Sequence, residues 1–209
     1  MNHRTKKRQL DTASIKRSLG LIVAAFGFIL YVQTIGYSFV IDDAFAIKQN
    51  TIVQQGIQGI GTLIHTPYRF GYWANKDELY RPLSLIMFAS EWQFFPDSPA
   101  MFHLINVLLY CITGYLLFRL LCRLFMNNYL IPFIASLLFM AHPVHTEVVA
   151  YIKSGDEILC FLLSIISINL VLDYLQKDAI IKLILASITL FLAMLAKETA
   201  FTMILVIPM

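Results

Sequence analysis

Long apolar runs without charge alternate with short charged segments along this chain. The first run, 19–41, has 23 residues, enough to cross about 30 Å of hydrocarbon at about 1.5 Å per residue. A secretory signal peptide would have an apolar region of only about 7–15 residues before a small-residue cleavage site, and this run is longer and ends in bulky residues. We therefore predict a basic cytoplasmic tail over 1–18 and a retained transmembrane helix over 19–41.

The middle of the chain predicts helices of unequal length. Residues 42–101 form an external loop of mixed polarity with several Gly and Pro breakers. Within this loop, 83–95 predicts a short helix lying in the membrane interface, since Glu91 excludes a simple span. A second full span is predicted over 102–125. The apolar run 129–141 has only 13 residues, which is about 20 Å of helix. It crosses the membrane only if its helix continues past the break that follows.

The last part of the chain predicts a helical hairpin. Two apolar runs, 158–175 and 179–196, are joined by a short polar turn. A final run begins at Thr199 and has 11 residues, so we expect this sequence to be the front part of a longer protein. Residues 102–209 then form one membrane domain. The fold class is an all-α polytopic membrane protein with about five full or short spans and a truncated sixth.

Composition favours a membrane protein over a soluble enzyme. Hydrophobic residues make up 58% and charged residues 14% of the 209 residues, and mean hydropathy is +0.70, whereas soluble domains carry about 25% charge. The net charge of +3 includes a basic N-terminal tail, which indicates topology and no nucleic-acid partner. Cys111, Cys122 and Cys160 all lie in apolar runs and indicate neither a disulfide framework nor metal ligands.

The distribution of charge predicts the orientation, because basic residues collect on the cytoplasmic side of membrane proteins. With a cytoplasmic N-terminus, the inner side holds ten of the 16 basic residues: Arg4, Lys6, Lys7, Arg8, Lys16, Arg17, Arg119, Arg123, Lys177 and Lys182. The outer side, periplasmic or lumenal, holds ten of the 13 acids: Asp42, Asp43, Asp77, Glu78, Glu91, Asp97, Glu147, Asp156, Glu157 and Glu198. Acidic residues contribute little to topology, so their gathering indicates a reaction centre at the outer surface.

Two adjacent carboxylates, Asp42 and Asp43, stand directly after the first predicted span. They either hydrate the end of a helix or supply a general base at the boundary of water and lipid, where one acid tunes its neighbour. A lipid-linked substrate presents its headgroup at this depth, which favours the catalytic interpretation.

A histidine motif follows the short apolar run. His142 and His145 are three residues apart and share a helical face, and Glu147 follows them. These three ligands would suit a metal-dependent membrane hydrolase, but the spacing does not match His-Glu-x-x-His and offers no obvious separate ligand. The motif otherwise caps a helix or binds substrate in a polar pocket opened by the short helix. We expect neither a metal nor another cofactor.

Outer cations stand beside acids near two further helix ends. Lys153 precedes Asp156 and Glu157, which the helix dipole favours in a first turn, so a cap explains the acids and Lys153 is available to meet a phosphate. Lys197 and Glu198 either form an ion pair between two apolar runs or place the lysine against a lipid phosphate.

Arg81 is another outer cation, fixed at a predicted helix start by the proline that follows it. The sequence contains no Gly-rich phosphate loop and no Ser nucleophile elbow. Any phosphate chemistry is therefore expected to involve a lipid carrier instead of a soluble nucleotide sugar.

Five strings in this order resemble the transmembrane and tetratricopeptide-repeat O-mannosyltransferases, within the protein O-mannosyltransferase group of the C-type glycosyltransferase fold. The strings are Tyr37-Ser38-Phe39-Val40-Ile41-Asp42-Asp43, Tyr80-Arg81-Pro82-Leu83, Phe102-His103-Leu104-Ile105-Asn106, His142-Pro143-Val144-His145-Thr146-Glu147 and Ala196-Lys197-Glu198. The resemblance covers nearly the whole chain from Tyr37 onward, and the histidine string is its most specific part.

The resemblance implies an enzyme that transfers a mannose-like sugar from a polyprenyl-phosphate carrier to a protein or glycan hydroxyl, above all that of a protein Ser or Thr, at the outer membrane face. It implies no nucleic-acid partner. Asp42 or Asp43 is then the base that activates the acceptor, and Arg81, Lys153 and Lys197 offset the charge of the departing phosphate. The family commonly carries an Arg in the turn where this sequence has Gly155. Lys153 substitutes there as a point charge without the bidentate fork of Arg.

The rival interpretation is a non-catalytic polytopic membrane protein, such as a transporter subunit or a scaffold. An inactive fragment of the transferase is a further alternative. A transporter buries ionisable groups near the middle of the membrane, whereas the long apolar runs here carry none at their centres. The partners expected for the transferase are the lipid-linked sugar donor, the hydroxyl acceptor and membrane lipid.

Overall fold

The computed structural model describes residues 3–72, 79–126 and 128–206. Within these residues the chain is helical and contains no strand. Asp77 and Glu78, which the sequence places on the outer face, lie outside the described residues, as do the side chains of the basic residues at positions 4–8 and the last three residues of the final apolar run.

Within the described residues, three helices are long and apolar enough to cross a membrane: Ala13–Gly36, Pro99–Leu124 and Gly155–Lys177. A fourth span is added if α6 (Leu130–Met140) and α7 (Val144–Ala150), which are bent by 65° at their break, count as one. The helix α9 (Ile180–Ala196) is apolar but has only 17 residues. The prediction of an all-α polytopic membrane protein is confirmed, with three or four full-length spans and one shorter helix in the described part.

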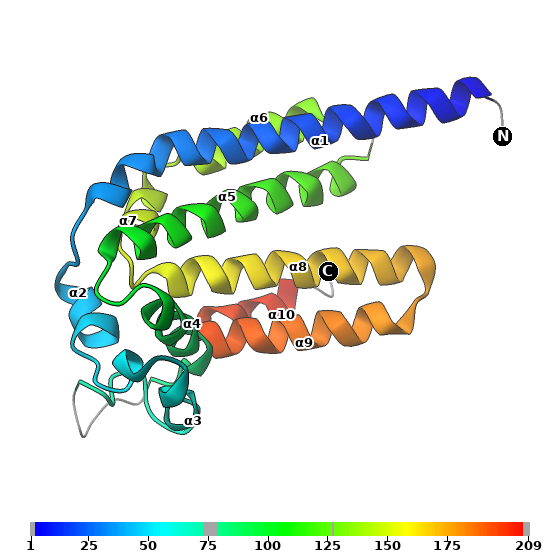
Figure 1. Cartoon of the computed structure of the whole chain (residues 1–209). Helices are drawn as coiled ribbons and strands as arrows, with labels where there is room; N and C mark the ends of the chain where they lie inside the picture. The colour runs from blue at the N-terminus through cyan, green and yellow to red at the C-terminus, as the bar shows by residue number, and fades with distance from the viewer. Residues whose placement is uncertain (1–2, 73–78, 127, 207–209) are drawn as a thin grey trace.

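The long helices lie side by side, and four of the short helices in the described part of the chain gather at one end of them (Figure 1). We call the end that carries α2 (Ile41–Asp43), α3 (Ile60–Leu63), α4 (Pro82–Phe94) and α7 the loop end. The end that carries the start of α1 (His3–Tyr31), the end of α5 (Pro99–Leu124) and the turn between α8 (Gly155–Lys177) and α9 is the opposite end.

The first helix differs from its prediction at both ends. It begins within the expected tail, at His3, and its α-helical part stops at Tyr31, followed by a 3-10 turn, η1 (Val32–Gly36). The hydroxyl of Thr34 donates to the Tyr31 carbonyl at 2.8 Å, and such local side-chain bonds compete with the helical ladder. Tyr37 is then extended, so the apolar residues up to 41 leave the helix, and among them Phe39 packs edge-on against Phe102 with ring centres 5.8 Å apart.

The expected external loop is more ordered than its Gly and Pro content indicated. It forms α2 (Ile41–Asp43), the π-helix η2 (Ala44–Lys48), the 3-10 helix η3 (Val53–Gly59) and α3 (Ile60–Leu63). The buried Asn50 side chain organises this segment, since its Oδ1 accepts the N–H groups of Ile52 and Val53, each at 3.1 Å. These short helices pack on α4 around a shared apolar core.

The predicted short helix 83–95 is present as α4 (Pro82–Phe94), within one residue at each end. It begins at Pro82, whose fixed φ suits the first helical position. The Ser84 hydroxyl donates to the Ala196 carbonyl at 2.7 Å, so α4 is fastened to the end of α9. This contact brings the segment before α4 next to the segment after α9.

Glu91 on α4 is a buried carboxylate, 6% exposed, whose two oxygens have no hydrogen-bond partner among the described residues. Burial raises its pKa to about 8. Between its ordinary pKa, near 4.5, and about 8, Glu91 is protonated in the folded protein but ionised in the unfolded chain. The contribution of Glu91 to stability is therefore complete below pH 4.5 and is lost as the pH rises through about 8. The folded protein is therefore expected to lose stability between these two pH values on account of Glu91.

We predict that Glu91→Gln, which matches the neutral acid in shape, raises the unfolding temperature more at pH 8 than at pH 5. Thermal unfolding of the purified protein in detergent at both pH values measures this. Lys48→Gln, at an exposed ion pair with Asp97, serves as the control and should show no such pH dependence. An equal effect of Glu91→Gln at both pH values would contradict a protonated Glu91.

Candidate active site

Seven charged side chains meet at the loop end, and we call them the charged cluster. They come from four separate segments of the chain: Asp43, Arg81, Lys153, Asp156, Glu157, Lys197 and Glu198. All of them except Asp156 are candidate site residues of the sequence analysis. The fold therefore brings together residues that are up to 155 positions apart in the chain, from 43 to 198.

Arg81 lies at the centre of the charged cluster and is 6% exposed. Its Nη1 donates to Asp156 Oδ2 at 2.9 Å, while Nε and Nη2 donate to the two carboxylate oxygens of Glu198 at 2.8 and 2.5 Å. This fork-to-carboxylate geometry is the one that Arg provides and Lys does not. The guanidinium also lies 5.4 Å from the centre of the buried Tyr68 ring. Burial lowers the pKa of Arg81, but the Glu198 hydrogen bond and the Asp156 charge raise it overall.

Asp156 is the residue that the sequence analysis missed. It stands in the first turn of α8, as the cap interpretation expected, but it is fully buried. Besides Arg81, it has Lys153 Nζ at 3.6 Å and Lys197 Nζ at 3.6 Å. The spacing of three residues between Lys153 and Asp156 was visible in the sequence. The approach of Arg81 and Lys197 to Asp156 depends on the tertiary structure, and no local sequence pattern predicts it.

Lys197 directly follows the last residue of α9 and is 8% exposed. Its ammonium group bonds Glu157 as well as approaching Asp156. The ion pair that the sequence suggested between Lys197 and Glu198 is therefore replaced by two others, in which Glu198 pairs with Arg81 and Lys197 with Glu157.

Asp42 and Asp43 have different environments. Asp43 is fully buried, and its two oxygens accept the backbone N–H groups of Val40 at 2.9 Å and Lys153 at 2.8 Å. Burial raises the pKa of Asp43, and these two hydrogen bonds oppose the rise. Asp43 therefore ties α2 to the turn before α8. Asp42 is exposed, so of the two it is the carboxylate that an acceptor can reach, and its role as the base stays a prediction.

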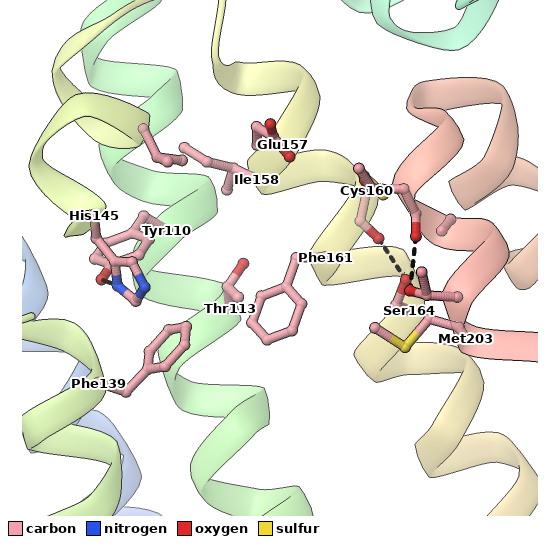
Figure 2. Close-up of a pocket in the computed structure, with 14 residues that line it drawn as sticks. Tyr110, Thr113, Phe139, His145, Glu157, Ile158, Cys160, Phe161, Ser164 and Met203 are labelled. Carbon is pink, nitrogen blue, oxygen red and sulfur yellow. Dashed lines mark hydrogen bonds between the residues drawn. The ribbon is translucent and has the colours of Figure 1, made fainter. Parts of the chain in front are cut away.

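A cavity of about 330 Å³ adjoins the charged cluster through Glu157, which is part of its lining (Figure 2). Its walls come from α5, α6, α7, α8 and the segment after α9. Phe139 and Phe161 stack with ring centres 5.6 Å apart on one side of it, and Met203 lies across from them. The walls are mainly apolar, which corrects the expectation of a polar pocket near the histidine motif.

The structure separates the members of the histidine motif. His145 lines the cavity, where its Nδ1 lies 2.7 Å from the Tyr110 hydroxyl. The centres of the His145 and Phe139 rings are 4.2 Å apart. His142 accepts the Val144 N–H at 3.3 Å and is exposed, as is Glu147, and neither lines the cavity. In the described part of the chain, no three side chains of His, Cys, Asp or Glu converge as a metal site would need.

Gly155, where the resemblance led us to expect an Arg, lies against a buried asparagine. A Cβ atom at this position would stand 2.5 Å from Asn106 Oδ1 and 3.1 Å from Met87 Cε. Asn106 in turn donates to the carbonyls of Tyr151 and Ile152 at 3.1 and 3.0 Å. A side chain at position 155 would thus require Asn106 to shift, and Lys153 is the cation of this turn.

We predict that Gly155→Ala destabilises the protein by about 1–3 kcal/mol, the usual cost of overpacking a filled site. Gly61→Ala is the matched control, since a Cβ there meets nothing within 4 Å. Unfolding temperatures of the two variants in the same detergent measure the difference. A Gly155→Ala variant as stable as Gly61→Ala would show that Asn106 gives way at no cost.

The fold and the charged cluster define a polytopic helical membrane protein with a buried ionic site at one end of its spans. Among curated proteins, the chain is 34% identical over 160 residues to the protein O-mannosyl-transferase tmtc2 of Xenopus laevis, covering 70% of this chain and 18% of that protein. It is 30% identical over 204 residues to the protein O-mannosyl-transferase Tmtc1 of Drosophila melanogaster, covering 93% and 23%. The human protein O-mannosyl-transferase TMTC1 is 28% identical over 220 residues, covering 95% and 24%.

These matches confirm the resemblance to the protein O-mannosyl-transferase group that the motifs indicated. The chain spans about a fifth of the length of these relatives. No family model and no solved structure matches the chain.

Proposed function

We propose that this chain forms part of a membrane O-mannosyltransferase that transfers mannose from a polyprenyl-phosphate carrier to a protein Ser or Thr hydroxyl. The observation that carries this proposal is the junction of the charged cluster with the apolar cavity at Glu157. A lipid-linked sugar has a long apolar chain and an anionic headgroup, and the two parts of this site suit those two chemistries. The names of the relatives support the sugar and the class of acceptor.

The pairing of the cations decides how a phosphate group binds. Arg81, Lys153 and Lys197 all lie within 4 Å of a carboxylate, so a phosphate has to replace one of these acids. The Glu198 side chain is 52% exposed, whereas Asp156 is fully buried. In our proposal Arg81 keeps Asp156, and the phosphate takes the place of Glu198 on the Nε and Nη2 side of the fork.

The reaction that follows is an inverting displacement. The acceptor hydroxyl attacks the anomeric carbon and gives its proton to Asp42, a new C–O bond forms, and the bond from that carbon to the phosphate oxygen breaks. The leaving phosphate takes the bonding electrons, and Arg81 and Lys197 stabilise its charge electrostatically. His145, held by Tyr110, lines the cavity in which the carrier lipid binds.

A transfer assay with the whole protein tests this proposal. The purified protein is supplied with radiolabelled mannose on a polyprenyl phosphate or on a nucleoside diphosphate, together with a Ser- and Thr-containing acceptor peptide. We expect label in the peptide only from the lipid-linked donor, and base treatment should release it from the Ser and Thr side chains. Transfer from the soluble donor alone, or transfer from neither, would contradict the proposal.

The same proposal places the loop end outside, facing the periplasm or a lumen, with the N-terminus in the cytoplasm. We predict that Gln54→Cys reacts with a membrane-impermeant thiol reagent applied from that side. Gln54 is exposed on η3, and the three native cysteines are buried, so the background is low. Labelling that requires access from the cytoplasmic side would invert the topology and remove the outer reaction face.

A further inference from the structure

A second cavity, of about 400 Å³, lies at the opposite end of the long helices, between α1 and α5. Four of the residues that line it are basic, namely Lys16 and Arg17 on α1 and Arg119 and Arg123 on α5, and none of its lining residues is acidic. We call it the basic cavity. It shares no residue with the charged cluster, and the start of α1 and the end of α5 lie away from the loop end (Figure 1).

The close approach of α1 and α5 forms the floor of the basic cavity. At Gly20, a Cβ would stand only 2.8 Å from the Tyr115 ring and 3.2 Å from Phe118, so the two helices touch there. About one helical turn before Gly20, toward the opposite end, α1 carries Lys16 and Arg17, and both residues line the cavity. Tyr115 and the buried Phe118 line its inner part, so an apolar floor lies beneath basic side chains.

Most of the charge in the basic cavity is not neutralised by the protein. Arg123 is the exception, because it forms an ion pair with Asp173 at 2.8 Å and donates to the Asn169 carbonyl at 2.9 Å. Lys16, Arg17 and Arg119 form no ion pair within the described part of the chain, and Arg119 instead lies 6.0 Å from the centre of the Tyr115 ring. The charged cluster is different, since each of its cations has a carboxylate within 4 Å.

The depth of the basic cavity is that of lipid headgroups. The apolar span on α1 starts at Ala13 and that on α5 ends at Leu124, so the four basic residues lie within the last turns of two membrane spans. The preference of basic residues for the cytoplasmic side explains why they lie at this end. It does not explain why three unpaired cations from helices about a hundred positions apart converge on one cavity with an apolar floor.

We propose that the basic cavity binds the headgroup of an anionic phospholipid from the leaflet at this end of the protein. A phosphodiester supplies the negative charge that Lys16, Arg17 and Arg119 lack, and Arg offers it two parallel donors. The glycerol backbone and the first methylenes of the acyl chains contact the aromatic floor. Basic pockets between membrane helices are a known form of such lipid recognition.

Native mass spectrometry of the purified protein, titrated with dioleoyl-phosphatidylglycerol or dioleoyl-phosphatidylcholine, tests the proposal. These lipids share their acyl chains and differ in headgroup charge. We expect the anionic lipid to bind about tenfold more tightly or better, from roughly three unpaired cations. The double variant Arg17→Gln/Arg119→Gln should lose this preference.

The matched control is Lys177→Gln/Lys182→Gln, which removes two positive charges at the same end, where neither residue lines the basic cavity. It should keep the preference for the anionic lipid. Equal loss in both double variants would mean that only general surface charge acts, and equal binding of the two lipids by the unaltered protein would overturn the proposal. Displacement of the bound lipid by glycerol phosphate at equal concentration would indicate a soluble anion instead and would also overturn it.

Discussion

Asp42→Asn in the whole protein is expected to reduce the turnover of mannosyl transfer by about two orders of magnitude or more, while binding of the lipid-linked donor stays nearly unchanged. A positioned general base contributes about 10²–10⁴ in rate, or roughly 3–5 kcal/mol of barrier. Asn keeps the size of the side chain and removes its basicity. Asp42 is exposed, so the substitution breaks no buried contact and folding should be unaffected.

Asp43→Asn provides the comparison that separates chemistry from structure. Both oxygens of Asp43 accept backbone N–H groups, and an amide can accept through only one of its two terminal atoms. This variant should therefore unfold at a lower temperature, whereas Asp42→Asn should unfold like the unaltered protein. Single-turnover kinetics and thermal unfolding, measured on both variants, distinguish the roles. Unaltered turnover in both would mean that neither acid is the general base.

Arg81→Gln is expected to destabilise the protein by about 3–5 kcal/mol, the usual cost of removing one partner from a buried ion pair. The substitution leaves Asp156 fully buried with two lysines at 3.6 Å and without its 2.9 Å hydrogen bond. It also frees Glu198, but that side chain is about half exposed, so water replaces its partner at little cost. The loss therefore arises mainly at Asp156.

The control for Arg81→Gln is Lys48→Gln, which breaks an ion pair at 3.2 Å between side chains that are 47% and 62% exposed. Exposed pairs contribute about 0–1 kcal/mol, so this variant should hardly change the unfolding temperature. Adding Asp156→Asn to Arg81→Gln removes the buried charge and should recover part of the loss. If Arg81→Gln and Lys48→Gln had the same small effect, the charged cluster would not be a buried ionic site.

The spans were the part of this protein that the sequence determined by itself. The helices predicted over 102–125, 158–175 and 179–196 correspond to α5 (Pro99–Leu124), α8 (Gly155–Lys177) and α9 (Ile180–Ala196). The length of an apolar run and the charges that bound it are local properties, and a bilayer requires that the backbone be satisfied within each segment. The end of the first helix was missed because a 3-10 turn ends it at Gly36 and Tyr37 is extended, although the apolar run continues to residue 41.

Only the tertiary structure decided how the candidate residues divide into roles. Residues close together in the sequence have side chains in different environments. Asp43 is buried whereas Asp42 is exposed, and His145 lines a cavity whereas His142 does not. Asp156 looked like a helix cap from its position in the sequence, but α4 and α9, fastened together by Ser84, bring Arg81 and Lys197 beside it. A buried carboxylate depends on the charges that surround it in three dimensions, and those come from residues that no local pattern connects.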